Sequence, residues 1–308
     1  LRSSPLRPRL VSKGSTLCEH DPGEVSLQPR NVRFDWTQTP LNWMPRELIA
    51  SHTVSALNLL LPEGERWFCA TYTEALPLIA DAKLREDVLG FIGQESMHAE
   101  THNDVLYEYL DAHGIDPRPF TAHAEYLMRK VLGPRPGLSV RAQKHQLVDR
   151  IALIGAIEHM TAFLGDYALN SRWDEFGGDA NMIDLYRWHG AEEVEHRNVA
   201  HDVAMYFGVG YVRRNLSMLF AFVSFLVLML RGTRYIVRHD PSLKDRGYIV
   251  LWFQWLRAMR RGSLPSLAQM TKGVARYLKP NYTPDGEGST AQAVAYLAGS
   301  PAARTPLQ

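Results

Sequence analysis

The sequence predicts an all-α fold, in which a four-helix bundle is followed by additional C-terminal helices. Runs of alternating β-branched residues are few, so strands are not expected. Four long segments have apolar residues at helical spacing and are bounded by stretches that contain glycine or proline. Two of the four carry Glu-x-x-His, as Glu95–His98 and Glu193–His196. A bundle whose helices turn such motifs toward a common centre can hold metal ions.

The composition is that of an ordinary globular protein, with 308 residues of which 45% are apolar and 22% charged. The formal net charge of +1 provides no field that would attract nucleic acid. Two cysteines, Cys18 and Cys69, argue against a disulfide framework and favour the cytoplasm. Residues 1–15 are rich in Arg, Pro and Ser and lack an apolar stretch, so we expect a disordered leader and no secretory signal.

An irregular arm, residues 1–40, is expected first, because its five prolines interrupt any periodicity. Pro62 then opens a helix over 63–80, since proline is tolerated in the first turn. A second helix is expected over 83–113, where Gly114 and two prolines follow. These two helices form the first pair of the predicted bundle.

The second pair of the bundle follows a short helix predicted over 123–132. Its first member, over 139–170, begins at Ser139, a suitable N-cap. Its second member covers 180–207. The bundle domain is therefore expected over 41–210.

Beyond the bundle, an apolar passage over 216–230 precedes helices predicted over 247–261 and 263–278. We expect C-terminal helices packed on the bundle over 211–280. The remainder, 281–308, contains several glycines and prolines and is predicted to be a poorly ordered tail.

The apolar passage 216–230 allows more than one interpretation. Its fifteen residues are fewer than the ~20 that span a bilayer, and arginines bracket it closely. The favoured interpretation is a helix that packs on the bundle and forms a wall of a substrate channel. A shallow dip into a membrane, or a wall of a lipid-sized pocket, stays open. Basic residues downstream would add weak membrane association at most, which makes the expected location cytoplasmic and peripheral to the membrane.

The two Glu-x-x-His motifs each aim two side chains at one point, since positions i and i+3 share a helix face. His102 is nearly eclipsed with Glu95, and His189 lies on the same stripe as Glu193 and His196. Any one of these could be a solvated residue or a hydrogen-bonded core histidine. A bundle core would not hold so many ionisable groups unpaired, so the set predicts a metal site.

Each motif is expected to work with one glutamate from the preceding helix. Glu158 stands in an apolar run, where a carboxylate is costly unless a cation neutralises it. Glu65 occupies the corresponding place in the first pair, with Glu63 as its rival, while Glu192 is the rival of Glu193. The predicted metal ligands are Glu65, Glu95, His98, His102, Glu158, His189, Glu193 and His196. No catalytic group beyond these ligands and no organic cofactor site is predicted.

Hard carboxylates combined with imidazoles, and without cysteine, fit two iron ions, and manganese is the second choice. Gln94 and Glu192 directly precede the two motif glutamates, so they are candidates to orient the imidazoles through the nitrogen that faces away from the metal. His159 and His201 fall off the stripe and are interpreted as structural.

This ligand pattern resembles that of the ferritin-like di-iron carboxylate superfamily, which includes multicomponent monooxygenases and acyl-carrier-protein desaturases. The additional His189 is similar to the extra histidine of the p-aminobenzoate N-oxygenase group. Over about residues 60–285 the chain resembles more closely a bacterial family of predicted metal-dependent hydrolases. Five motifs carry this resemblance: Pro62-x-Gly-Glu-Arg66, Gln94-Glu-x-x-His-x-x-x-His102, Glu158-His-x-Thr-Ala162, Trp188-His-x-x-Glu-Glu-x-Glu-His196 and Tyr277-Leu-x-Pro280. The resemblance implies a ferritin-like helical bundle with a metal site, and it leaves the reaction open.

Two functions are expected from these observations. The first is a non-haem di-iron oxidoreductase, of oxygenase, oxidase or desaturase type, that uses O2 on an apolar acyl or aryl substrate. The alternative is a metal-dependent hydrolase that uses a metal-bound water. An enclosed apolar site would favour the first, and an open hydrated site would favour the second. A storage protein is disfavoured by the number of histidines.

The expected partners follow from what the sequence lacks. It contains no nicotinamide or flavin fingerprint, so an oxidoreductase would take electrons from a donor protein or from its substrate. We expect a homodimer.

Overall fold

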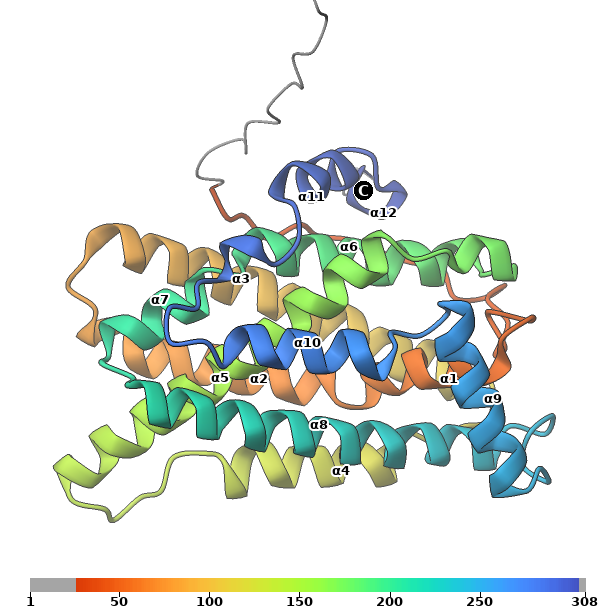
Figure 1. Ribbon diagram of the computed structural model, residues 1–308, viewed down its shortest axis with the longest axis horizontal. Coiled ribbons are helices and arrows are strands. Elements are labelled where there is room, and N and C mark those ends of the chain that lie inside the picture. Colours follow the sequence, from red (N-terminus) through yellow and green to blue (C-terminus); the bar gives the residue numbers. More distant parts are fainter. Residues whose placement is uncertain (1–25, 305–308) are drawn as a thin grey trace, which may run out of the picture.

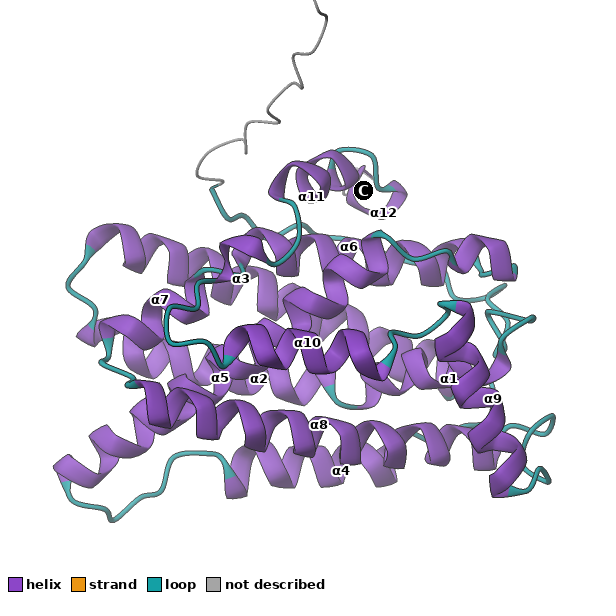
Figure 2. Ribbon diagram, in the orientation of Figure 1, coloured by secondary structure: helices purple, strands orange, loops and turns teal. Residues whose placement is uncertain are grey.

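The computed structural model describes residues 26–304, and within this range the chain is helical without a strand (Figure 2). The predicted all-α class is therefore confirmed. The predictions for the leader, for Cys18, for residues 1–25 of the arm and for residues 305–308 of the tail lie outside the described residues. The division of the chain at residues 40, 210 and 280 stays a prediction.

Four helices surround the centre of the molecule (Figure 1). They are α2 (Leu61–Ala75), α3 (Ala82–Asp104), α5 (Val140–Leu169) and α6 (Ala180–His196). α2 packs against α3, α5 packs against α6, α2 also contacts α5, and α3 also contacts α6. Each of the four therefore lies beside two others, and their inward side chains face one another.

Side-chain caps fix where three of these helices begin. Asp81 accepts a hydrogen bond from the backbone N–H of Leu84 at the start of α3. Ser139 accepts one from Ala142 at the start of α5, and Asp179 caps α6 in the same way. Each cap satisfies a backbone donor that has no partner inside the helix. The N-cap predicted at Ser139 is confirmed.

α5 and α6 approach each other closely at Gly165 and Gly190. A Cβ atom on Gly165 would lie 2.5 Å from the carbonyl oxygen of Gly190, and one on Gly190 would lie 2.6 Å from the Cα of Gly165. Because no side chain fits at either position, the crossing of the two helices depends on both glycines. His189 directly precedes Gly190, so the crossing also positions that imidazole.

The chain departs from the predicted helix boundaries after His196. The helix predicted over 180–207 is two helices, α6 and α7 (Val199–Tyr206), with a turn between them. The turn lets the buried guanidinium of Arg197 donate to the carbonyl oxygen of Val194 and to Oγ1 of Thr290, at 2.9 Å from the latter. A buried arginine needs such partners, and the helical periodicity did not reveal them.

The first part of the molecule contains elements that the sequence pattern did not separate. α1 (Leu48–Ser55) precedes the bundle and was not predicted. The helix predicted over 83–113 corresponds to α3 followed by the π-helical segment η3. The helix predicted over 123–132 corresponds to the end of α4 (Arg118–Tyr126) followed by the π-helical segment η4. The bounds of the η segments are η1 (Ala56–Leu59), η2 (Leu76–Leu78), η3 (Val105–Leu110), η4 (Leu127–Val131), η5 (Trp173–Phe176) and η6 (Pro284–Gly286).

Three helices follow the bundle: α8 (Tyr211–His239), α9 (Tyr248–Arg261) and α10 (Leu267–Tyr277). α8 packs against α5 and α1, so one of its faces covers the bundle, as predicted. It has 29 residues and so extends beyond the fifteen-residue apolar passage at both ends. The prediction that this segment is too short to span a bilayer is thus wrong. In length and composition α8 is the one helix of the described residues that could cross a membrane.

Beyond residue 280 the chain is partly helical, contrary to the poorly ordered tail that its glycines and prolines predicted. α11 (Thr290–Leu297) and α12 (Pro301–Arg304) lie on α6, at the top of Figure 1. Asp184 of α6 anchors them, since its carboxylate accepts hydrogen bonds from Tyr296 Oη at 2.6 Å and from Ser300 Oγ at 2.9 Å. This contact joins residues far apart in the sequence, so composition alone could not indicate it.

Candidate metal centre

All eight predicted ligands lie together in the interior, and all eight are buried. α2 supplies Glu65, α3 supplies Glu95, His98 and His102, α5 supplies Glu158, and α6 supplies His189, Glu193 and His196. The three predicted ligands on α3 lie in the sequence between Phe91, which belongs to one apolar core cluster, and Val105, which belongs to another. A centre of this kind is polar only at its middle, where carboxylates and imidazoles meet.

The ligand atoms form overlapping groups, and those of each group lie within 4.8 Å of one another. The first is Glu65, Glu95 and His98. The second is Glu95, Glu158, Glu193 and His196. Since both contain Glu95, the arrangement offers two neighbouring cation positions with a carboxylate between them. Two further groups bring in the remaining histidines: His98 with His189 and Glu193, and Glu65 with His102 and His189.

The motif histidines are held so that one ring nitrogen faces the carboxylates. His98 donates from Nε2 to Glu192 Oε2 at 3.0 Å, which leaves Nδ1 on the side of the centre. His196 donates from Nδ1 to Gln94 Oε1 at 3.1 Å, and its Nε2 lies 3.2 Å from Glu158 Oε2. The predicted contacts of Gln94 and Glu192 with these two rings are confirmed. Such partners fix the tautomer of a metal-binding imidazole.

The donor atoms at the middle of the centre suit a cation. Within residues 26–304, both carboxylate oxygens of Glu65, Glu95 and Glu158 are buried and accept no hydrogen bond, and Nδ1 of His98 has no hydrogen-bond partner either. Buried oxygen atoms without partners are strongly unfavourable unless a positive charge lies between them. Carboxylates with imidazoles are the ligands that divalent iron and manganese accept, so the residues fit the predicted ions.

The pKa values of Glu65, Glu158 and His196 are raised, so these three groups tend to hold protons. Burial raises the pKa of Glu158 to about 8, and the carboxylate of Glu193 adds to this. Burial and the nearby Glu95 raise the pKa of Glu65 well above its usual range. Burial by itself lowers the pKa of His196, but Glu193 and Glu158 outweigh it and raise that pKa well above 6.5. In the metal-free protein, protons therefore offset the charge that metal ions would neutralise.

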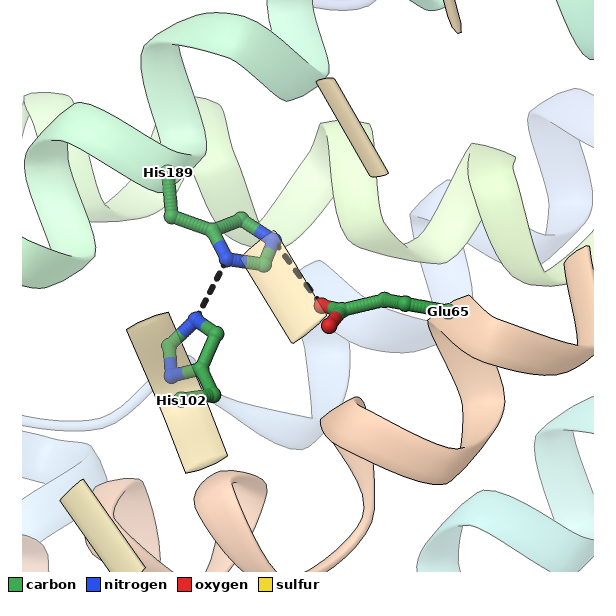
Figure 3. A group of neighbouring side chains, drawn as sticks. All are labelled: Glu65, His102 and His189. Carbon is green, nitrogen blue, oxygen red and sulfur yellow. Dashed lines mark hydrogen bonds and ion pairs between the residues drawn. The ribbon is translucent and has the colours of Figure 1, made fainter. Parts of the chain in front are cut away.

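A chain of hydrogen bonds sets the orientation of His189, whose ring lies between His102 and Glu65 (Figure 3). The carbonyl oxygen of Ser55 accepts from Asn58 Nδ2 at 3.1 Å, so the amide oxygen of Asn58 faces His102. Nδ1 of His102 must then donate to that oxygen, at 2.7 Å. Burial lowers the pKa of His102 well below its usual value, so the ring is neutral and its Nε2 accepts from His189 Nδ1 at 2.6 Å.

This chain turns Nε2 of His189 toward the carboxylates, where it forms a hydrogen bond with Glu193 Oε1 at 2.9 Å and lies 4.0 Å from Glu65 Oε1. His102 is buried and bonded to His189, so it orients a predicted ligand. The sequence reasoning missed Asn58, although an asparagine inside the apolar run around Leu57–Leu61 was a signal that it has a buried partner.

Residues 28–288 match a protein family described as predicted metal-dependent hydrolase. The chain belongs to this family. The closer of the two predicted resemblances is thereby confirmed, and the family description agrees with the buried His and Glu clusters. No curated protein and no solved structure matches the chain closely enough to add to this assignment.

In this member of the family, the arm before the bundle also contacts the groups around the centre. Arg30 donates from Nη1 to Glu192 at 2.8 Å and to Glu195 at 2.7 Å. Glu195 in turn accepts from Gln94 Nε2 at 3.1 Å. Arg30 therefore supports both carboxylates behind the motif histidines. Sequence reasoning missed it because an arginine in an irregular arm has no periodicity to interpret.

An apolar cavity of about 270 Å³ adjoins the centre in this family member. Glu65, Glu95, His189 and Glu193 line it, and nearly all of its other walls are apolar. α8 contributes Phe220, Ala221, Ser224, Phe225 and Leu228. α8 therefore forms a wall of the cavity beside the site, as predicted, and the use of this cavity as a substrate channel stays a prediction. A molecule in this cavity would contact apolar side chains along its length and the metal ligands at one side.

Proposed function

We propose that the chain is an enzyme with a two-metal centre in a ferritin-like four-helix bundle, and that its substrate is an apolar acyl or aryl compound. The observation that carries the proposal is the set of buried carboxylate oxygens without hydrogen bonds beside an apolar cavity. One ion would be held by Glu65, Glu95 and His98, with His189 nearby. The other would be held by Glu158, Glu193 and His196, and Glu95 would lie between the two ions.

Hydrolysis is the reaction that the family description supports. The ions would supply a water of lowered pKa and polarise an ester or amide carbonyl. The chain itself would bind the acyl group among the apolar walls and place its carbonyl beside Glu65 and His189. His102 and Asn58 would hold His189 in the tautomer that leaves Nε2 available.

Oxidation with O2 at a di-iron centre is a second candidate, favoured by a specific observation. The ligands are enclosed and the adjoining cavity is apolar, as an oxygenase, oxidase or desaturase requires. The ligand pattern, one glutamate and one Glu-x-x-His from each helical pair, also resembles the di-iron carboxylate proteins. In this case the walls would exclude water and hold a C–H or N–H bond at the centre, and a donor protein would supply electrons.

One set of assays separates the two reactions. The protein is loaded with Fe(II), Mn(II) or Zn(II) and given p-nitrophenyl esters of increasing acyl length under nitrogen. In parallel, O2 consumption by the reduced iron form is followed with long-chain acyl and aryl compounds. Ester cleavage without O2 supports the hydrolase, whereas O2 uptake with an oxidised product supports the oxidoreductase.

Glu158→Ala serves as the inactive variant in these assays, and Glu100→Ala, an exposed glutamate of α3, serves as its matched control. A fully loaded protein that shows neither activity on any compound would contradict the proposed enzyme.

A further inference from the structure

The outer face of α8 is apolar and exposed over about five turns. The exposed side chains recur every three or four residues, so they form one stripe. They belong to Val212, Leu216, Leu219, Phe220, Val223, Val227 and Leu230, and each of these residues is 48% to 68% exposed. A contiguous apolar stripe of this length on a protein surface marks a contact site.

α9 continues this surface. Its exposed side chains are Tyr248, Ile249, Val250, Trp252, Phe253 and Leu256. Two arginines of α8 join the helices, since Arg234 lies 4.9 Å from the ring centroid of Tyr248 and Arg238 donates to its hydroxyl at 3.1 Å. We call the exposed stripe of α8 and these residues of α9 the α8–α9 face. In Figure 1 α9 crosses the C-terminal end of α8.

The segment that carries the α8–α9 face is strongly basic. Residues 211–261 contain ten Arg and Lys and two Asp, although the whole chain has a net charge of +1. One of the two aspartates, Asp240, is buried against His52, with 2.7 Å between its Oδ2 and Nε2. Among the ten cations, Arg214 is buried, and Arg213 and Arg261 pair with Asp149 and Glu47. The exposed arginines therefore gather at the C-terminal end of α8 and along α9, and include Arg231, Arg257 and Arg260. Apolar side chains flanked by cationic ones match the acyl region and the anionic headgroups of a lipid surface.

The cavity reaches the surface at this same face. Phe220 is 56% exposed and also lines the cavity, and Val131 of η4 is 41% exposed and lines it from the other side. Phe220 and Leu153 also border an open groove that contains Arg213. An acyl chain that entered beside Phe220 would keep apolar contacts from the surface to the metal ligands.

We propose that the α8–α9 face docks on a bilayer that contains anionic lipid, and that an acyl chain passes from the bilayer into the cavity beside Phe220. The docking is inferred from the exposed residues of the α8–α9 face alone. The acyl chain as a substrate rests on the proposed function. A second copy of the chain is a poorer occupant, because a symmetric contact would bring two basic faces together. A spanning α8 would lose its packing on α5 and α1.

Cosedimentation with vesicles tests the docking. The full chain is mixed with vesicles of phosphatidylcholine alone, or with about 30% phosphatidylserine added. We expect binding to the anionic vesicles that high salt reverses. Val223→Asp and Val227→Asp should weaken it roughly tenfold, and Arg257→Glu combined with Arg260→Glu should do the same. Leu89→Asp is the matched control, because Leu89 of α3 is 55% exposed outside this face.

Three results would overturn the docking. The first is no binding of the wild-type chain to either kind of vesicle. The second is a dimer in light scattering that Val223→Asp dissociates, because a second copy would then cover the face. The third is retention in the membrane at high salt and alkaline pH, because α8 would then be inserted. Metal content and circular dichroism of each variant show that the centre and the fold are intact, so these results do not depend on any enzymatic activity.

Native mass spectrometry tests the passage of the acyl chain. The protein is incubated with anionic vesicles that contain oleic acid, released with salt and weighed. We expect one fatty acid bound to the wild-type chain. Ala221→Phe and Ser224→Phe narrow the cavity wall, so they should bind vesicles normally and lose the fatty acid. If both variants retain the fatty acid as well as the wild-type chain does, or if the wild-type chain retains none, the proposed passage is contradicted. This outcome does not depend on whether hydrolysis or oxidation is found.

Discussion

At the scale of single residues, the centre is a set of oxygen and nitrogen atoms for which protons and metal ions compete. The four residues of the two Glu-x-x-His motifs and the two single glutamates could be predicted as ligands from the sequence, because helical periodicity places them on inward faces. The residues behind them could be chosen only where they directly precede a ligand, as Gln94 and Glu192 do. Asn58 and Arg30 could not, since they contact the centre from another part of the chain, across 44 and 162 residues.

Removing one ligand from each half of the centre should remove the metal without unfolding the protein. Glu95→Ala and His196→Ala should each lose most of the bound metal, because Glu95 belongs to both cation groups and His196 faces three carboxylates. Elemental analysis measures the metal, and circular dichroism measures the helical content. Glu100→Ala, on the exposed side of α3, should keep both. If both ligand variants retain a full metal complement, the metal site lies elsewhere.

Metal binding should release protons. Below about pH 8 most Glu158 carries a proton in the metal-free protein, and a metal ion requires the carboxylate. The apparent affinity should therefore rise with pH up to about 8. Titration calorimetry in buffers of different ionisation enthalpy counts the released protons. Glu158→Gln should release fewer, and an affinity independent of pH in the wild-type chain would refute the expectation.

Asn58→Leu should weaken metal binding without abolishing it. The variant removes the acceptor that fixes the tautomer of His102 and, through it, of His189. Loss of such an outer partner lowers metal affinity by roughly 10- to 100-fold. Competition with a chromophoric chelator measures the change. We expect His189 to contribute less to the metal affinity, while the histidines of the two motifs still bind the metal. An affinity equal to that of the wild-type chain would show that the hydrogen-bond chain is not needed.

At the scale of elements, helix type and approximate position followed from the sequence, whereas several helix ends did not. The N-cap of α5 could be identified because capping is local. The end of α6 and the existence of α11 depend on buried contacts of Arg197 and Asp184 with distant residues. The length of α8 was underestimated because its arginines were taken as the limits of the helix, although Arg213, Arg214 and Arg231 all lie within it.

The glycine contact between α5 and α6 should be sensitive to a single methyl group. Gly165→Ala should cost about 1–3 kcal/mol of unfolding free energy, since its Cβ would lie 2.5 Å from the carbonyl oxygen of Gly190. It should also weaken metal binding, because His189 follows the movement of α6. Chemical denaturation measures the first effect and metal titration the second. Gly64→Ala is the control, as a Cβ there meets nothing within 4 Å, and it should leave stability equal or higher.

At the scale of the whole molecule, the family assignment and the all-α class followed from motifs spread over most of the chain. The cavity and the α8–α9 face did not, because each combines side chains from several elements. The interpretation of 216–230 came nearest, as it anticipated a wall of a channel and a basic neighbourhood. Which side of α8 covers the bundle depends on tertiary packing against α5.

Metal should stabilise the folded state strongly. Free metal at 100 times its Kd would add about 2.7 kcal/mol to the unfolding free energy. The metal-free protein should lose stability as the pH rises from the usual range of a glutamate to about 8, because folded Glu158 holds its proton more tightly than the unfolded chain does. Thermal melts with Mn(II) and with a chelator, across this pH range, measure both effects. A melting temperature unchanged by metal would contradict a centre buried among the four helices.

The hydrogen bonds of Arg30 have a consequence for how the protein can be shortened. Its position before the first helix suggests a dispensable leader, and a fragment that begins at Asn31 would keep every helix. That fragment would nevertheless remove the guanidinium partner of Glu192 and Glu195. Glu192 orients His98 directly, and Glu195 holds Gln94, which orients His196. The smallest unit competent to assemble the centre therefore begins upstream of the bundle, at a residue that belongs to no secondary structure.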